Sequence, residues 1–117
     1  KRIDNANQVM TSGTSYTIVN AGTVDTYPIV TIIGAFTAIT FTNNDTGKTL
    51  TITTTRIAGD VTIVDFKQRS VTINGIQNSL VANGTWWPVT VGGDSVKAAV
   101  TGGPPTSITI ASYSGWL

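Results

Sequence analysis

The stretch TYPIVTIIG, residues 26–34, contains the longest apolar run of the chain and decides the fold. It includes Pro28, whose fixed φ suits the start of a strand and whose missing N–H excludes a central ladder position. It ends at Gly34, and between these two residues four Ile or Val side chains surround one threonine. β-branched residues at consecutive positions fill both faces of a strand. We therefore predict an organising strand that is buried on both sides or covered by a second layer.

The composition points to a single all-β domain. The chain has 117 residues, of which 22 are Thr and only three are Leu, so β-branched residues far outnumber helix formers. It contains no Cys, His or Glu, which removes thiol chemistry and the commonest general base at neutral pH. Seven scattered Lys and Arg form no basic stripe, and no apolar run approaches the ~20 residues of a membrane span. We therefore expect neither nucleic-acid binding nor membrane insertion.

Short alternating segments separated by turn residues follow the organising stretch. Two pairs of segments, 38–42 with 49–53 and 61–66 with 70–73, are predicted to form hairpins. Residues 76–84 are predicted to be a loop in which Leu80 fills the core. About eight to ten short strands at this spacing predict an antiparallel β-sandwich of the galectin-like or jelly-roll type. The remaining predicted strands are 15–20, 85–91, 95–100 and 107–113.

The pair Trp86-Trp87 is the clearest candidate for a contact with another molecule. Adjacent residues of a strand point to opposite faces. Trp87 has the same parity as Val89, so we predict that Trp87 points inward and Trp86 outward. The strand 85–91 contains Pro88 and should therefore lie at a sheet edge or carry a bulge. An outward Trp86 has three open roles, namely stacking on a sugar, anchoring a protein contact, or plain packing.

Asp65 and Arg69 lie at the loop of the second predicted hairpin, where we expect them to form a structural turn pair and a surface ion pair. The functional alternative is a catalytic carboxylate, as in a glycosidase, which needs two carboxyl groups facing one cleft. Asp60 lies on the neighbouring turn, but nothing in the sequence brings it together with Asp65. We therefore predict no catalytic residue.

Two polar motifs near the first hairpin imitate binding sites. TGKT at 46–49 resembles the end of a phosphate-binding P-loop, but Thr42 stands where that motif needs Gly, and a strand follows in place of a helix. NND at 43–45 offers oxygen ligands for Ca²⁺, but no further carboxylates follow at the required spacing. Both motifs are assigned to a turn, and we predict no metal and no cofactor.

The segment AGDVTIVDFKQRSVTING, residues 58–75, resembles the C-terminal domain of the distal tail proteins (Dit) of long-tailed, non-contractile bacteriophages. The resemblance covers roughly residues 20–117 and rests on the order and spacing of several short motifs. These are Tyr27-Pro28, NNDTGKT at 43–49, Gly59-Asp60, a strand ending at Asp65, Arg69, Val71 before Asn74-Gly75, Trp86-Trp87 before a Gly-rich turn, and the final Trp116-Leu117.

The resemblance implies a galectin-like β-sandwich at the tail tip of a virion, with a structural and non-enzymatic role. In the family this sandwich projects from a ring and can hold other tail proteins, so the expected partners are tail-tube, tip or receptor-binding proteins. The parent protein is then expected to be a homo-hexamer and the isolated domain a monomer.

The family's ring-forming N-terminal domain has no counterpart in this sequence. The chain is therefore expected to be either a C-terminal fragment of a longer protein or a sandwich used alone. We expect residues 1–20 to be a connecting segment with a first strand, and 21–117 to form the sandwich, within a single domain overall.

A second hypothesis is a carbohydrate-binding module for polysaccharide of the host cell surface or cell wall. It rests on Trp86, Tyr113 and Trp116 as stacking groups and on the many Thr and Asn side chains. A third is a sandwich domain from an unrelated surface protein such as a pilin or adhesin.

Overall fold

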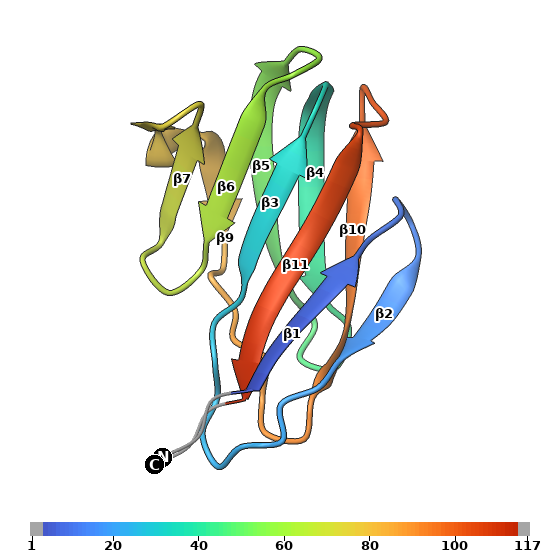
Figure 1. Cartoon of the computed structure of the whole chain (residues 1–117), viewed down its shortest axis with the longest axis vertical. Coiled ribbons are helices and arrows are strands. Elements are labelled where there is room, and N and C mark those ends of the chain that lie inside the picture. Colours follow the sequence, from blue (N-terminus) through green and yellow to red (C-terminus); the bar gives the residue numbers. More distant parts are fainter. Residues whose placement is uncertain (1–3, 115–117) are drawn as a thin grey trace.

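The computed structural model describes the backbone of residues 4–114 and the side chains of residues 8–111. Within this range the chain forms two antiparallel sheets that pack face to face (Figure 1). The first sheet has the order β1 (Asp4–Val9), β11 (Ser107–Ser114), β3 (Ile29–Ile33), β6 (Val61–Asp65), β7 (Ser70–Ile73) and β8 (Ile76–Gln77). The second has the order β2 (Ser15–Ile18), β10 (Asp94–Thr101), β4 (Phe36–Asn43), β5 (Lys48–Arg56) and β9 (Ala82–Gly84). The predicted antiparallel β-sandwich is confirmed, and the strands not predicted are β1, β8 and β9.

The organising stretch forms β3, which lies inside the six-stranded sheet between β11 and β6. Val30 and Ile32 are fully buried against the second sheet. Of the two predicted alternatives, cover by a second layer is found on this face, whereas burial on both sides is not, because Ile33 on the opposite face is 38% exposed. The sandwich has two layers, so the outer face of a central strand is covered only by its neighbours within the sheet.

The two predicted hairpins are confirmed, and their inward residues form most of the core. β4 pairs with β5, and β6 pairs with β7, both antiparallel. Side chains at alternate positions of these strands meet in one cluster, as a period of two requires. The fully buried side chains include Phe36, Ile39, Phe41, Leu50, Ile52, Val64 and Val71.

The segment after β7 differs from the prediction. Leu80 lies on a short 3-10 helix, η1 (Ser79–Val81), and is 97% exposed, so its assignment to the core is wrong. Val81 and Ala82 pack against the core in its place. The segment is tied to β7 just before Leu80, by hydrogen bonds from the Asn78 N–H to the Val71 carbonyl oxygen and from the Val71 N–H to the Ser79 hydroxyl.

The N-terminal residues contribute one strand to each sheet. β1 pairs with β11 from Asp4↔Ser114 to Val9↔Thr109, and β2 pairs with β10. The N-terminal part of the expected connecting segment is thus held by β11 from Asp4 onward. Asp4 and Ser114 lie side by side at the lower end of the sandwich (Figure 1). The division at residue 20 between a connecting segment and the sandwich stays a prediction.

Adjacent isoleucines of β3 allow a matched test of the sandwich core. Ile32→Ala should lower the free energy of unfolding by about 2–5 kcal/mol, because it leaves a cavity in a fully buried site. Ile33→Ala, on the outer face, should cost less than about 1 kcal/mol. Chemical denaturation of both variants measures the difference, and equal losses would contradict the assignment of the two faces.

Candidate functional site

The segment 85–91 is not a regular strand, in contrast to the prediction. Its pairing is limited to an isolated bridge between Val89 and Thr26. Pro88 has no N–H to donate to a ladder. Gly84, just before the segment, has a φ of 123° and lies so close to Thr49 that a side chain there would meet its carbonyl oxygen. The chain leaves β9 at this point and crosses the lower end of the sandwich before β10 begins.

Trp87 anchors this segment in the core, as predicted from its parity. It is 1% exposed, and its indole Nε1 donates a hydrogen bond of 3.1 Å to the carbonyl oxygen of Phe41. Its ring lies 4.7 Å from that of Phe66, which also contacts Phe41 edge-on at 6.1 Å. Because Phe41 belongs to β4 and Phe66 follows β6, this aromatic cluster joins the two sheets.

Trp86 does not project freely from the surface. Its side chain is half-buried, and its ring meets that of Phe66 at 5.7 Å and 86°, in an edge-to-face contact. The part of Trp86 that reaches solvent is therefore the rim of a packed aromatic cluster. This arrangement suits an anchor in a protein contact better than an open platform for a sugar ring.

The other two predicted contact residues cannot be placed. The backbone of Tyr113 belongs to β11, but its side chain lies outside those the structure describes. Trp116 lies outside the described residues altogether. A contact by either residue stays a prediction.

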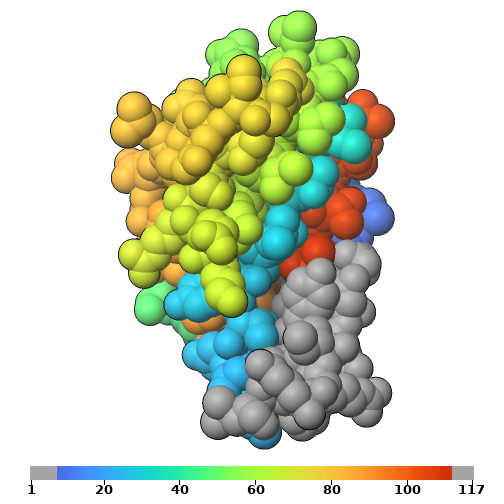
Figure 2. Space-filling model, turned by 60° about the vertical axis from the view of Figure 1, so that its left-hand side comes forward, coloured from blue at the N-terminus to red at the C-terminus, as the bar shows by residue number. Residues whose placement is uncertain are grey.

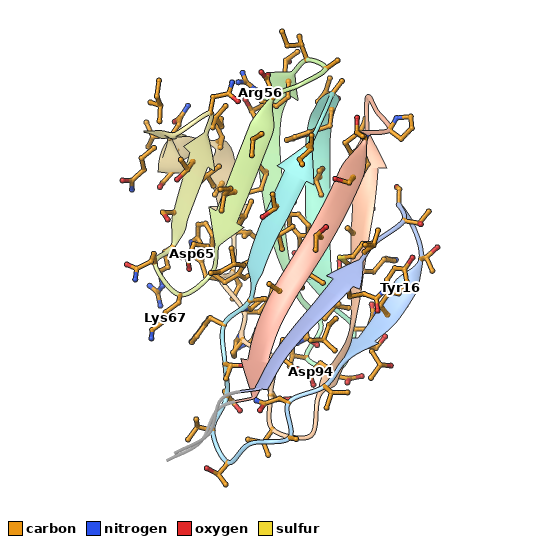
Figure 3. The ribbon with its side chains drawn as sticks, viewed as in Figure 1. Tyr16, Arg56, Asp65, Lys67 and Asp94 are labelled. Carbon is orange, nitrogen blue, oxygen red and sulfur yellow. The ribbon has the colours of Figure 1, made fainter. Side chains whose placement is uncertain are left out.

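Asp65 and Arg69 both shape the β6–β7 turn, but through the backbone. Asp65 Oδ1 accepts hydrogen bonds from the N–H groups of Lys67 and Gln68, at 3.0 and 3.1 Å. Arg69 has a φ of 53°, in the left-handed region. Among the side chains that the structure describes, the expected ion pair between Asp65 and Arg69 is not formed. Figure 3 shows Asp65 and Lys67 at the end of this hairpin, and the turn projects in Figure 2.

The left-handed φ of Arg69 leads to a prediction about the stability of the domain. A non-glycine residue in the left-handed region costs roughly 1–2 kcal/mol. Arg69→Gly should therefore raise the free energy of unfolding by about 0.5–1 kcal/mol, after the larger unfolded-state entropy of glycine is subtracted. Gln68→Gly is the matched control, because Gln68 does not have a positive φ and should lose stability. If both variants lose stability in denaturant titrations, the strain at Arg69 is disproved.

A buried polar network fixes the end of the segment 85–91. Asp94 is 3% exposed and accepts hydrogen bonds from the Thr90 N–H, the Thr90 hydroxyl and the Asn43 amide, at 2.8, 2.6 and 2.7 Å. Asn43 uses its own oxygen to accept the N–H groups of Asp45 and Thr46 in the β4–β5 turn. The motifs NND and TGKT therefore make up the β4–β5 turn and the strand residues on either side of it, so the expected assignment to a hairpin turn is confirmed.

The pKa of Asp94 reflects this network. Burial alone would raise it, but the hydrogen bonds from Thr90 and Asn43 outweigh burial and hold the pKa below its usual value of 3.8. Asp94 was not among the predicted site residues. A usable signal was an acidic residue directly after Gly92-Gly93 at the start of an apolar strand.

Asp94 should make the stability of the domain depend on pH. Because its folded pKa is lowered, its contribution is complete above about pH 4 and is lost as the pH falls through the folded pKa. Asp94→Asn should cost about 1–3 kcal/mol at pH 7, because the amide cannot accept all the donors that face it. The difference from the unchanged protein should shrink toward pH 2 in denaturant titrations. A loss that does not depend on pH would contradict a charged carboxylate at this position.

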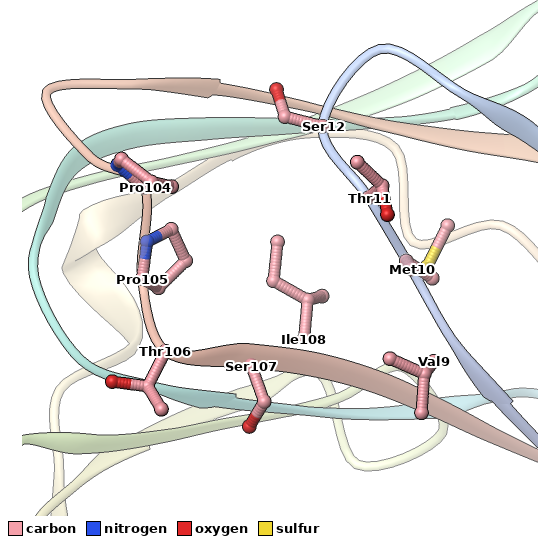
Figure 4. A pocket seen from close by; sticks show the side chains of 9 residues that line it. All are labelled: Val9, Met10, Thr11, Ser12, Pro104, Pro105, Thr106, Ser107 and Ile108. Atoms are coloured by element: carbon pink, nitrogen blue, oxygen red, sulfur yellow. The ribbon is translucent and has the colours of Figure 1, made fainter.

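The hollows of the described surface offer no set of reactive groups. One, of about 220 Å³, lies between residues 9–12 and 104–108 and is lined by apolar and hydroxyl side chains without a charge (Figure 4). Another, of about 280 Å³, is lined by Arg56, Ile73, Asn74, Ile76 and Asn78. Among the described residues no group of three or more His, Cys, Asp or Glu is placed to hold a metal ion. No helix in the same part of the chain is long and apolar enough to cross a membrane.

The outer faces of the two sheets differ in chemistry. On β3 and β6 the outward positions include Ile33 and Ile63, which are 38% and 37% exposed. On β4 and β5 the outward positions are mostly threonine, and the hydroxyls of Thr40 and Thr51 lie 3.1 Å apart. The sandwich thus has a strip of isoleucines on the outer face of β3 and β6 and an aromatic cluster at one end, and both features suit a structural or binding module.

Comparison with known proteins assigns this module to a family. Residues 21–112 match the family described as siphovirus-type tail component, C-terminal domain. The chain therefore belongs to this family, as its sequence motifs predicted, and is a structural component of the tail of the virion. This membership decides against the pilin or adhesin alternative. No curated protein matched the sequence.

A solved structure supports the fold. The SPP1 Dit (gp 19.1) protein, described as a paradigm of the hub adsorption apparatus in phages that infect Gram-positive bacteria, superposes with a TM-score of 0.75 and 16% identity. The match covers 95% of this chain and 46% of that protein, so the chain spans about half its length.

Proposed function

We propose that this domain is the peripheral β-sandwich of a distal tail protein and that it docks another tail-tip or receptor-binding protein. The observation that carries the proposal is the family match over residues 21–112. The resemblance to a protein of a hub adsorption apparatus supports a position at the tail tip. The parent protein in this proposal is a homo-hexamer that also contacts the tail tube.

The surface chemistry supports a contact with protein. The outer face of β3 and β6 leaves isoleucine side chains uncovered, and the aromatic cluster reaches the surface at Trp86. Trp and uncharged apolar side chains at the centre of a patch are typical of protein interfaces. The role is mechanical and requires no catalysis. No feature of the described surface specifically favours a polysaccharide, because Trp86 packs against Phe66.

A reconstruction of the virion by electron cryo-microscopy tests this proposal. We expect six copies of the sandwich around the tail axis at the tip, each in contact with a second kind of tail protein. A sandwich found in the capsid, or one that contacts no second protein at the tip, would contradict the docking role. Binding of the isolated domain to purified host cell walls would favour the carbohydrate alternative, provided that Trp86→Ala abolishes it.

A further inference from the structure

The charged side chains of the described surface divide into two groups. Each aspartate whose side chain is described accepts a hydrogen bond from at least one backbone N–H, so the acids hold turns in place. These bonds join Asp25 to Val91, Asp45 to Ser95, Asp60 to Ile57, Asp65 to Lys67 and Gln68, and Asp94 to Thr90. Arg56 pairs with Asp60 at 3.7 Å. The acids are thus committed to the fold itself.

Lys67 and Arg69 have no such task, a property that they share with Lys48 and Lys97 of the second sheet. Both are exposed at the tip of the β6–β7 turn, and within the described side chains neither forms an ion pair or a side-chain hydrogen bond. The nearest acid in the sequence, Asp65, holds the turn through its carboxylate. Two cations beside one committed carboxylate leave this tip with a positive charge.

The backbone at Arg69 is a second observation that points to its side chain. A left-handed φ is adopted cheaply by glycine or asparagine, and the neighbouring β7–β8 turn uses Asn74 and Gly75 for this purpose. Arg69 adopts the same region with a long, charged side chain. The backbone therefore does not explain an arginine here, whereas a role for the guanidinium group outside the domain does.

The turn stands beside the exposed rim of the aromatic cluster. Phe66 directly precedes Lys67, and its ring contacts Trp86. The N–H of Phe66 binds the carbonyl oxygen of Pro28, which brings the 37%-exposed Tyr27 to the same end of the sheet. We call Tyr27, Lys67, Arg69 and Trp86 the turn patch. Trp, Tyr and Arg are the residues that most often dominate protein interfaces.

We propose that the turn patch binds an acidic segment of a neighbouring tail protein. Carboxylates of that segment pair with Lys67 and, in bidentate geometry, with the guanidinium group of Arg69. An apolar side chain next to those carboxylates covers Trp86. The inference rests on the proposed docking function and names the surface and the charge of the partner. An acidic protein segment fits better than an anionic glycan, because the Trp86 ring is engaged with Phe66.

Zero-length cross-linking of intact virions tests this pairing. A carbodiimide joins a lysine amine to a carboxylate only where the two are in contact, without a spacer. We expect Lys67 to be joined to an Asp or Glu of a different tail protein. Lys97, which lies on β10 in the other sheet, serves as the internal control and should give no such product.

The possible products separate this inference from the proposed function. Links from Lys97 to a second tail protein, without links from Lys67, would leave docking intact and overturn the turn patch. An absence of links from this domain to any other virion protein would count against both. Links from Lys67 to cell-wall carboxylates, formed only on adsorbed virions, would replace the protein partner with a glycan.

A variant phage provides the second test. Arg69→Gly relieves the backbone, so the domain should unfold at the same or a higher temperature. The yield of the Lys67 product should nevertheless fall about tenfold, because the bidentate pair is lost. Lys97→Gln removes one charge on β10, which pairs with β2 and β4 away from the turn patch, and should leave the yield unchanged. An unchanged Lys67 yield in Arg69→Gly virions, with the domain folded, would refute the role of Arg69.

Discussion

The aromatic cluster of Phe41, Phe66 and Trp87 is the constraint on which the lower end of the sandwich depends. The three rings belong to β4, to the end of β6 and to the segment before β10, so one cluster ties both sheets and their irregular connection together. The Trp87 indole satisfies its only donor on the Phe41 carbonyl oxygen. This bond sets the depth of the whole segment, because a buried indole N–H without an acceptor would be unfavourable.

The polar groups around that cluster follow from it. With Trp87 fixed, Pro88 and Thr90 are brought against Asn43 and Asp94, and the Asn43 amide donates to both the Pro88 carbonyl oxygen and Asp94. A carboxylate as buried as that of Asp94 is tolerated only because donors surround it. The side-chain oxygen of Asn43 also accepts the two backbone N–H groups that hold the β4–β5 turn. Among the described side chains, short polar groups and not ion pairs hold the place where two turns and a connection meet.

The sequence predicted the regular part of this structure well and the irregular part poorly, for a physical reason. In β3 to β7 and in β10 to β11, burial alternates with a period of two, and that alternation is visible in the residues. The same alternation correctly predicted that Trp87 points inward. It could not show that Leu80 is exposed, because hydrophobicity alone does not reveal which residue of a short turn the register leaves outside. The segment 85–91 alternates like a strand, yet Pro88 and the glycines at 84 and 93 remove the pairing that a strand needs.

The contrast between regular strands and irregular turns also explains why the β6–β7 turn can hold Arg69 with an unfavourable left-handed φ. β6 and β7 pair over four residues, and their inward side chains Val64 and Val71 are fully buried. Asp65 closes the turn through the backbone. Since the hairpin is stable without help from its tip, a residue there can be selected for what it contacts outside the domain. Strain at such a position lowers the stability of the sandwich slightly, and it persists because the packed hairpin holds the turn in place. A flexible tip would offer the same charge but would lose more entropy on binding.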